Sequence, residues 1–352
     1  MSEQVRAALA AVIEGRTLDL EVARLAMGSV MDGEATPAQL AALLVALRMR
    51  GETVEELAGF ATAMRERVLR VEAPAGTIDV VGTGGDGSGT FNISTTSALV
   101  VAAAGVPVAK HGNRAITSRS GAADVLEALG VRVDHSAESA AADLRDLGFA
   151  FLFAPGFHPA MRHAGPTRRE IGVRTAFNLL GPLTNPAGAT RALLGVGDAT
   201  AAPRMAEVAR RLGTERTLIV HGDGVDELPL DGSGVILDVT PAGIVASRVD
   251  PRLLGLRAAA TSELSGGTAD GNAAITVSIL DGHGGVRRDV VLLNAGAAFL
   301  AAGRVRSVAE GIALAAETIG AGRARVLLDR LRASKAAADS ALAAVEAEGG
   351  AP

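Results

Sequence analysis

The chain has 352 residues and a formal net charge of −5. A chain of this length can bury a substantial core, and no long polar tract indicates disorder. No basic block stands out, which argues against a non-specific nucleic-acid binder. The absence of cysteine excludes disulfides, thiolate metal sites and cysteine nucleophiles. The N-terminus lacks an apolar signal core, and the longest apolar run (98–109) is too short to span a bilayer, so we expect a cytoplasmic protein without a membrane segment.

The first 70 residues are predicted to be helical. Thr36 and Pro37 read as an N-cap followed by proline at the first helical position, and four leucines follow at helical spacing. Thr53 and Glu56 form a capping-box pattern ahead of a second apolar stripe. No ligand chemistry is visible here, so we assign this segment a structural or interface role.

After about residue 73, short β-branched runs alternate with helical stretches. The runs 78–81, 131–133, 218–220 and 235–239 are predicted strands, and their alternation with helices indicates an α/β layer with largely parallel strands. From about Asn272 the chain returns to alanine-rich helices. We therefore expect an α/β fold: a small N-terminal helical domain and a larger α/β domain around a central, largely parallel sheet.

A glycine-rich loop, GTGGDGSGT, follows the first predicted strand over residues 82–90. Glycines let backbone N–H groups approach an anion closely, and a helix starting near Ser94 adds its positive end. An ordinary turn with capping hydroxyls is the alternative. The spacing matches neither the P-loop nor the dinucleotide-binding motif. Asp86 would repel phosphate unless it faced ribose hydroxyls or a cation, which indicates a sugar phosphate bound with a metal.

A second polar loop, KHGNRAITSRSG over residues 110–121, follows a predicted strand at 106–109. Ligand sites of open α/β sheets lie at such carboxyl ends of strands. Helix capping accounts for Ser120, but it does not account for a lysine, a histidine, an asparagine and an arginine in one connection. We therefore expect this loop to face the same ligand as the glycine loop.

These two loops resemble the anthranilate phosphoribosyltransferase family. The likeness continues through FAPGFHPAMRHAGPTRREIGVRTAFNLLGPLTNPA (153–187) and VHGDGVDELPL (220–230), so it covers essentially the whole chain with four motifs in order. Ala122 stands where many members have serine, and Arg119 where many have lysine. The resemblance implies transfer of the phosphoribosyl group of phosphoribosyl pyrophosphate (PRPP) to the amine of anthranilate. The products are N-(5'-phosphoribosyl)anthranilate and pyrophosphate, in tryptophan biosynthesis.

The resemblance also implies the binding residues for PRPP. They are Gly82, Gly85, Asp86, Thr90, Asn92, Ile93, Ser94, Thr95, Lys110, His111, Gly112, Asn113, Arg114, Ala115, Ile116, Thr117, Ser118 and Ala122.

Anthranilate is implied to bind near Gly82, Asn113 and Arg168, with His111 and His158 lining its approach. No residue must serve as a strong general base, and a proton-handling role for His111 is a hypothesis.

A metal site is implied at Ser94, Asp226 and Glu227, with two Mg²⁺ ions. Adjacent carboxylates in a loop are alone a weak signal. Here they are expected at the sheet edge that carries both phosphate loops, and Mg²⁺ prefers one or two carboxylates completed by water and substrate phosphates.

Two arginines compete for the carboxylate of anthranilate. We expect a helix running from about Pro159, on which neighbours such as Arg168 and Arg169 point about 100° apart, so only one faces a given pocket. The resemblance favours Arg168, whose guanidinium fork matches a carboxylate. His163 and His221 are interpreted as structural.

The family fold divides the chain as 1–70, rejoined by about 165–187, for the helical domain, and 76–164 with 188–347 for the α/β domain. A homodimer through the helical domain is implied, and the apolar run 177–182 reads as hinge and pocket wall.

Two other functions remain open. A pyrimidine nucleoside phosphorylase shares this fold, but the KHGNRA segment speaks against it. A nucleic-acid-binding relative without transferase activity should be basic with degraded motifs, whereas this chain is acidic and keeps Arg168, Asp226 and Glu227.

Overall fold

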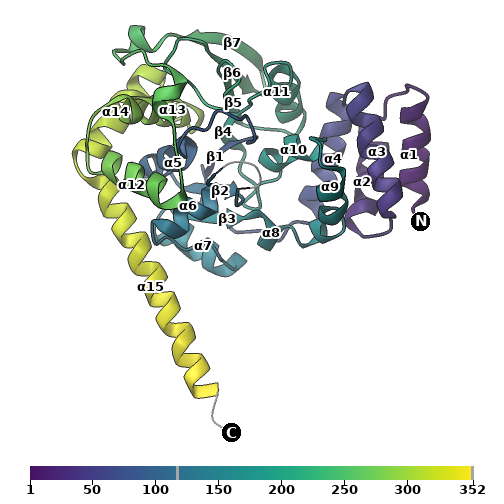
Figure 1. The fold of residues 1–352 in the computed structure, drawn as a ribbon, viewed down its shortest axis with the longest axis horizontal. Coiled ribbons are helices and arrows are strands. Elements are labelled where there is room, and N and C mark those ends of the chain that lie inside the picture. Colours follow the sequence, from purple (N-terminus) through teal and green to yellow (C-terminus); the bar gives the residue numbers. More distant parts are fainter. Residues whose placement is uncertain (116–118, 350–352) are drawn as a thin grey trace.

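Helices α1 to α4 form a bundle at the N-terminal end of the molecule (Figure 1). The computed structural model describes residues 1–115 and 119–349. The bundle helices are α1 (Glu3–Ile13), α2 (Leu20–Met31), α3 (Pro37–Arg50) and α4 (Val54–Glu66). Thr36 and Thr53 cap α3 and α4 in capping boxes with Gln39 and Glu56, and Pro37 opens α3, so the predicted helix starts are confirmed.

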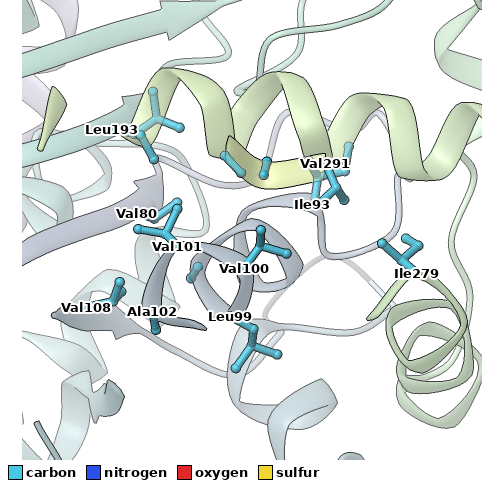
Figure 2. Packing of buried hydrophobic residues seen from close by; sticks show 14 of the residues in the cluster. Val80, Ile93, Leu99, Val100, Val101, Ala102, Val108, Leu193, Ile279 and Val291 are labelled. Atoms are coloured by element: carbon cyan, nitrogen blue, oxygen red, sulfur yellow. The ribbon is translucent and has the colours of Figure 1, made fainter. Parts of the chain in front are cut away.

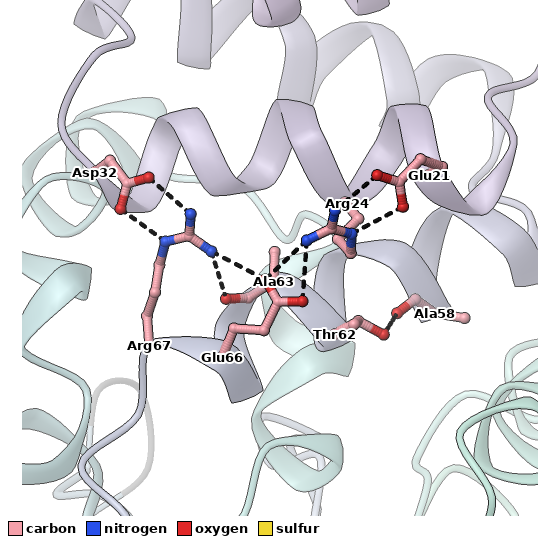
Figure 3. A network of polar contacts seen from close by, with 8 residues as sticks. All are labelled: Glu21, Arg24, Asp32, Ala58, Thr62, Ala63, Glu66 and Arg67. Atoms are coloured by element: carbon pink, nitrogen blue, oxygen red, sulfur yellow. Dashed lines mark hydrogen bonds and ion pairs between the residues drawn. The ribbon is translucent and has the colours of Figure 1, made fainter.

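Helices α2 and α4 pack closely against each other. A Cβ atom on Gly59 of α4 would overlap the backbone of α2, so the absence of a side chain permits this approach. Figure 3 shows the polar network across the pair, in which Arg24 lies 3.0 Å from Glu66 and Arg67 lies 2.7 Å from Asp32. Such partly exposed ion pairs contribute little free energy, so the apolar contacts beneath them carry most of the stability of the pair.

Beyond the bundle, seven strands of the described chain form one sheet in the order β3-β2-β1-β4-β5-β6-β7. The strands are β1 (Ile78–Gly82), β2 (Val108–Gly112), β3 (Phe149–Phe153), β4 (Arg191–Gly195), β5 (Arg216–His221), β6 (Gly234–Thr240) and β7 (Gly243–Val249). Strands β1 to β5 run parallel, while β6 and β7 are antiparallel to their neighbours. The expectation of a largely parallel sheet is therefore confirmed.

The predicted strands meet different outcomes. Runs 78–81, 218–220 and 235–239 lie in β1, β5 and β6, and the run 106–109 corresponds to β2, which starts two residues later. The strand predicted at 131–133 is wrong, because this segment is a loop. Its two valines are buried in the main core cluster, so burial rather than strand pairing accounts for the β-branched residues.

Helices cover both faces of the sheet. They are α5 (Ile93–Ala103) and α13 (Val286–Ala301) on one face, with α7 (Ala137–Asp146) and α11 (Ala202–Arg211) on the other. Alternation along the strands supplies both faces: Leu193 belongs to the cluster beneath α5 and α13, whereas its neighbour Leu194 belongs to the cluster that α11 shares with the bundle. Figure 2 shows the first cluster, in which Val80 and Leu193 lie beside Val101 of α5.

The connection from β3 to β4 leaves the α/β body and returns past the bundle (Figure 1). Its elements are α8 (Ala154–Phe157), the 3₁₀ turn η1 (Pro159–Arg162), α9 (Gly165–Ile171), α10 (Phe177–Leu180) and η2 (Gly181–Leu183). Helix α9 packs on α3, and α10 packs on α4. The helix expected from about Pro159 is interrupted: the 3₁₀ turn η1 begins at Pro159, and a separate helix begins at Gly165, with Pro166 in its first turn, where the missing N–H costs nothing.

The remaining elements lie around the α/β body. They are α6 (Ala122–Ala128), η3 (Pro251–Leu254), η4 (Thr261–Leu264), α12 (Ala269–Leu280), α14 (Val308–Gly320) and α15 (Arg323–Gly349). The helical C-terminal region predicted from about Asn272 is confirmed, and the end of α15 projects away from the body (Figure 1). Of the helices in the described ranges, none combines the length and the apolar character that crossing a membrane requires.

Strand order places a switch point between β1 and β4. From β1 the chain proceeds outward to β2 and β3, and after the bundle excursion it returns to the other side of β1 as β4. In open α/β sheets, ligands bind outside the carboxyl ends of the strands at such a point. The polar loops after β1, β2 and β5 all lie at this edge.

Candidate active site

Two glycines bring the loop after β5 onto the strand ends. Gly82 ends β1 and pairs in register with Gly195, which ends β4. A Cβ atom on Gly82 would overlap the side chain of Asp226, and one on Gly195 would overlap the backbone of Asp226. Asp226 therefore lies at the switch point, and this position depends on the absence of side chains at both strand ends.

Three acidic residues crowd together at this point. The Asp226 carboxylate accepts a hydrogen bond from the Gly84 N–H at 2.7 Å, and its own N–H donates to Asp86 at 3.3 Å. Burial, and then the charge of Asp86, raises the pKa of Asp226 to about 7. Burial, and then Asp226, raises the pKa of Glu227 well above its usual range. A bound cation would relieve this crowding, because it favours the ionised form of each carboxyl.

The donor set fits magnesium. Across the described residues, no group of three or more His, Asp or Glu side chains is arranged to hold an ion without help. Mg²⁺ needs less, since one or two carboxylates suffice when waters and substrate phosphates complete its octahedron. Glu227 also accepts a hydrogen bond from the Ser94 N–H at 2.9 Å, which places the predicted metal residues Ser94, Asp226 and Glu227 side by side.

The start of α5 faces this cluster with its positive end. Asn92 is the N-cap residue of α5 and Ile93 its first, buried residue, and the helix start near Ser94 is confirmed. The Lys110 ammonium donates to the Ser94 hydroxyl at 3.2 Å and to a β1 carbonyl; burial lowers its pKa, and nearby acids oppose this shift. Thr95 is buried, and its hydroxyl has no hydrogen-bond partner within the described residues.

The glycine loop itself is open. Gly84 and Gly85 are exposed and have φ angles of +69° and +65°, which only glycine adopts without strain. Thr90, at the far end of the loop, pairs with Ser265 through an isolated bridge. The loop is therefore anchored at its far end, while its two exposed glycines lie at the surface.

In the second loop, the Arg114 side chain is paired with acidic residues of α6. Its guanidinium pairs with Asp124 at 3.1 Å and with Glu127 at 2.5 Å, so this cation lies over α6. Asp124 also accepts from the N–H groups of Ala115 and Gly121, which closes the loop at its base. Gly112 ends β2, Asn113 is exposed and Ala122 begins α6. The predicted contacts of Ile116, Thr117 and Ser118 fall outside the described residues.

His111 and His158 form a buried pair, with ring centroids 5.0 Å apart. His111 Nδ1 lies 3.1 Å from the Gly181 carbonyl, and since a carbonyl only accepts, Nδ1 carries the proton and Nε2 is a bare acceptor. Burial lowers the pKa of His111 to about 3 and that of His158 to about 4, so both rings are neutral at physiological pH. Neither Nε2 atom has a partner in the described part of the chain.

Arg168 and Arg169 have different surroundings, as the sequence predicted. The Arg168 guanidinium lies 4.7 Å from the ring centroid of Phe177, and burial lowers its pKa. No carboxylate of the described residues pairs with it, so this cation is available to an anionic ligand. Arg169 is exposed.

Several polar residues of this edge were not identified from the sequence. Buried Asp79 in β1 accepts from the His111 N–H at 3.2 Å and from the Asn185 side chain at 2.7 Å, and burial raises its pKa to about 6. The sequence did offer a signal for Asp79, because a carboxylate inside an otherwise apolar strand is unusual. Asn272 of α12 donates to Asn92 at 2.9 Å, and no local pattern indicated this contact.

Known proteins share both the sequence and the fold. Residues 6–68 match the "Glycosyl transferase family, helical bundle domain", and residues 75–325 match the "Glycosyl transferase family, a/b domain". The anthranilate phosphoribosyltransferase of Symbiobacterium thermophilum is 51% identical over 93% of this chain and 97% of its own length. That of Mesorhizobium japonicum is 49% identical over 92% and 96%.

Solved structures agree with these relatives. The anthranilate phosphoribosyltransferase from Thermus thermophilus is 48% identical with a TM-score of 0.89, covering 93% of this chain and 99% of its own. The Saccharomyces cerevisiae enzyme, solved in complex with PRPP and Mg, is 27% identical with a TM-score of 0.87 over 96% and 99%.

The helical bundle and the α/β body, with polar loops at its switch point, define a protein of the glycosyl transferase family. The chain belongs to the anthranilate phosphoribosyltransferase family. This membership supports transfer to anthranilate over the phosphorylase and nucleic-acid-binding alternatives.

Proposed function

We propose that the family reaction takes place at the edge where β1, β2, β4 and β5 end. As a member of this family, the chain transfers the phosphoribosyl group of PRPP to the amine of anthranilate, a step of tryptophan biosynthesis. The observation that carries the assignment is the meeting of Asp226 and Glu227 with the glycine loop and the start of α5. The PRPP and Mg complex of the yeast relative supports it.

Asp226, Glu227 and Ser94 would hold magnesium, and we propose two ions. Bound Mg²⁺ would neutralise charge on the pyrophosphate leaving group. The chain's own residues hold the rest of the donor: backbone N–H groups of the glycine loop, the α5 N-terminus and Lys110 form a fixed positive cradle. The transition state should have oxocarbenium character, so positioning and stabilisation of the leaving group supply most of the acceleration.

Anthranilate would bind on the bundle side of the cradle. The unpaired Arg168 guanidinium above Phe177 would hold its carboxylate. The bare Nε2 of His111 would accept a hydrogen bond from its amine, which orients the nitrogen lone pair toward the ribose. His158, also neutral, would wall the approach. A ring with such a low pKa is a weak base, so His111 would orient the amine rather than remove a proton before attack.

The reaction is tested by the fluorescence of anthranilate, which should fall only when PRPP and Mg²⁺ are both present and should stop falling on addition of EDTA. Asp226→Asn with Glu227→Gln keeps the shape and removes two charges. This variant should need far more Mg²⁺ and bind PRPP more weakly, with anthranilate binding little changed. Turnover in EDTA, or unaltered magnesium dependence in the variant, would remove the metal assignment.

The phosphate cradle is tested separately at Thr95. Thr95→Val has nearly the same volume and removes the buried, unpartnered hydroxyl. A lost hydrogen bond to a charged phosphate should raise the KM for PRPP roughly 10-fold or more. Because the hydroxyl has no partner within the described residues, thermal stability should not fall. An unchanged KM would show that the phosphate lies elsewhere.

We also propose the domain division 1–70 with about 165–187 against 76–164 with 188–347. The packing of α9 on α3 and of α10 on α4 supports it. The homodimer is proposed to form through the bundle, where Ile13 of α1 and Met49 of α3 expose 70% and 84% of their surface.

A further inference from the structure

Arg174 bridges two parts of the molecule that are far apart in sequence. It lies between α9 and α10, in the connection that also carries Arg168. Its Nη1 donates to the Gly85 carbonyl at 2.9 Å, and its Nη2 donates to the Gly84 carbonyl at 3.0 Å. Within the described residues no carboxylate pairs with Arg174, so these carbonyls are its polar partners.

This contact determines which way two peptide groups face. A trans peptide directs its C=O and its N–H to opposite sides. One guanidinium that binds both carbonyls therefore directs the N–H groups of Gly85 and Asp86 away from Arg174. In the part of the chain that the structure describes, nothing accepts a hydrogen bond from either N–H. Successive N–H groups on one side of a glycine loop form an anion-binding concavity.

Arg174 also restricts the backbone conformation of the glycine loop. Gly84 and Gly85 lack side chains, and in the described structure only Arg174 is bonded to their carbonyls. Glycine peptides rotate readily, so without this contact the two N–H groups would have to be ordered when the ligand binds, at a cost in affinity.

We propose that Arg174 is a positioning residue that holds the glycine loop in its PRPP-binding form from the anthranilate side of the site. The inference rests on the proposed assignment of this loop to PRPP. Arg174 lies six residues after Arg168, so the segment that contacts anthranilate also orients the peptides that contact PRPP.

The test compares Arg174→Met, which keeps the apolar stem, with Arg174→Lys and with the exposed Arg169→Met as a matched control. Arg174→Met should raise the KM for PRPP about 10- to 100-fold, because two charge-assisted hydrogen bonds orient the donors. The KM of Arg174→Lys for PRPP should fall between those of the unmodified enzyme and Arg174→Met, because an ammonium lacks the planar fork that reaches both carbonyls. Arg169→Met should stay within about 2-fold of the unmodified enzyme.

A second readout separates positioning from general damage. Anthranilate binding without PRPP, followed by its fluorescence, should be unchanged in Arg174→Met, while the KM for PRPP rises. If Thr95→Val raises the KM for PRPP and neither Arg174 variant does, the inference is wrong and the proposed site stands. If none of the three raises it, the proposed site itself is wrong. An equal loss of free anthranilate binding in Arg174→Met would show mere structural damage and would also overturn the inference.

Discussion

Arg168 and Arg169 are adjacent in sequence, yet their environments differ. Arg168 lies against Phe177 without a carboxylate partner in the described residues, whereas Arg169 is exposed. A partly desolvated, unpaired guanidinium has lost hydration that a ligand carboxylate can replace. The difference in burial therefore distinguishes the arginine that is expected to bind a carboxylate from the one that is solvated.

Arg168→Ala should cost roughly 2–5 kcal/mol of anthranilate binding, as expected when one partner of a buried charge pair is truncated. This corresponds to about a 30- to 3,000-fold rise in the KM for anthranilate, with the KM for PRPP nearly unchanged. Arg169→Ala should change either constant by only a few-fold. Steady-state kinetics with each substrate varied in turn shows which of the two arginines binds anthranilate. Equal losses for both substrates, or the reverse ranking, would contradict the assignment.

The buried histidines predict a pH dependence of stability. The pKa values of His111 and His158 are lowered to about 3 and about 4 in the folded chain, whereas the unfolded value is near 6.5. Between these pH limits the unfolded state binds more protons than the folded state. The contribution of the two histidines to the free energy of unfolding is therefore constant above pH 6.5 and is lost as the pH falls. At pH 5 each histidine should lower the free energy of unfolding by about 2 kcal/mol.

Urea unfolding at pH 5, 6 and 7.5 measures this effect in His111→Gln and in His158→Gln. The stability difference between the unmodified chain and each variant should shrink by about 2 kcal/mol between pH 7.5 and 5. The comparison with a variant is needed, because Asp79 and Asp226 have raised pKa values and act in the opposite direction. A pH-independent difference would show that the rings titrate in the folded chain as they do in the unfolded chain.

At the scale of elements, the site is made by strand ends that approach without side chains. Gly82 and Gly195 pair in register on β1 and β4, and both lie against Asp226 of the loop after β5. The helix α5 then supplies one backbone donor, the Ser94 N–H, to Glu227. The position of the loop after β5 is thus determined by close contact with these strand ends, which leaves no room for a side chain at either glycine.

Gly195→Ala should therefore displace the backbone of Asp226. We expect a loss of about 1–3 kcal/mol of unfolding free energy from overpacking, together with a higher Mg²⁺ concentration for half-maximal activity. Gly156→Ala in α8 is the matched control, since a Cβ atom there meets nothing within 4 Å. Thermal unfolding and magnesium titrations would measure both effects. Normal magnesium dependence in Gly195→Ala would show that the metal does not depend on this approach.

At the scale of the whole molecule, the bundle is attached to the α/β body through α4, α11 and the β3–β4 connection. Arg211 of α11 pairs with Glu55 of α4 at 3.1 Å, and Arg65 donates to the Leu183 carbonyl at 2.6 Å. The site lies beside this junction, because Arg168 and Arg174 come from the connection. The outer helices α1 and α3 are left with exposed apolar side chains.

Light scattering at micromolar concentration should give twice the chain mass of 35.4 kDa. Met49→Arg should shift the mass toward the monomer, because a charge would be buried in the proposed interface. Leu253→Arg, at a side chain that is 86% exposed in the α/β body, should leave the dimer intact. A monomeric unmodified chain would overturn the proposed interface.

The sequence alone determined much of this protein, wherever the cause is local. Capping at Thr36 and Thr53, the glycine loop after β1 and the start of α5 follow from neighbouring residues, and all are present. The motifs were also sufficient to indicate the family. The strand predicted at 131–133 failed because β-branched residues also serve buried loops.

Only the tertiary structure decided which distant residues meet. Arg174 and the glycine loop are 89 residues apart along the chain, and Asp226 contacts Gly84 across 142. Whether a polar residue is paired is equally non-local: Arg114 is held by Glu127, whereas Arg168 is left unpaired in the described residues. Strand order and the bundle excursion bring these groups together, and neither is written in the pattern of neighbouring residues.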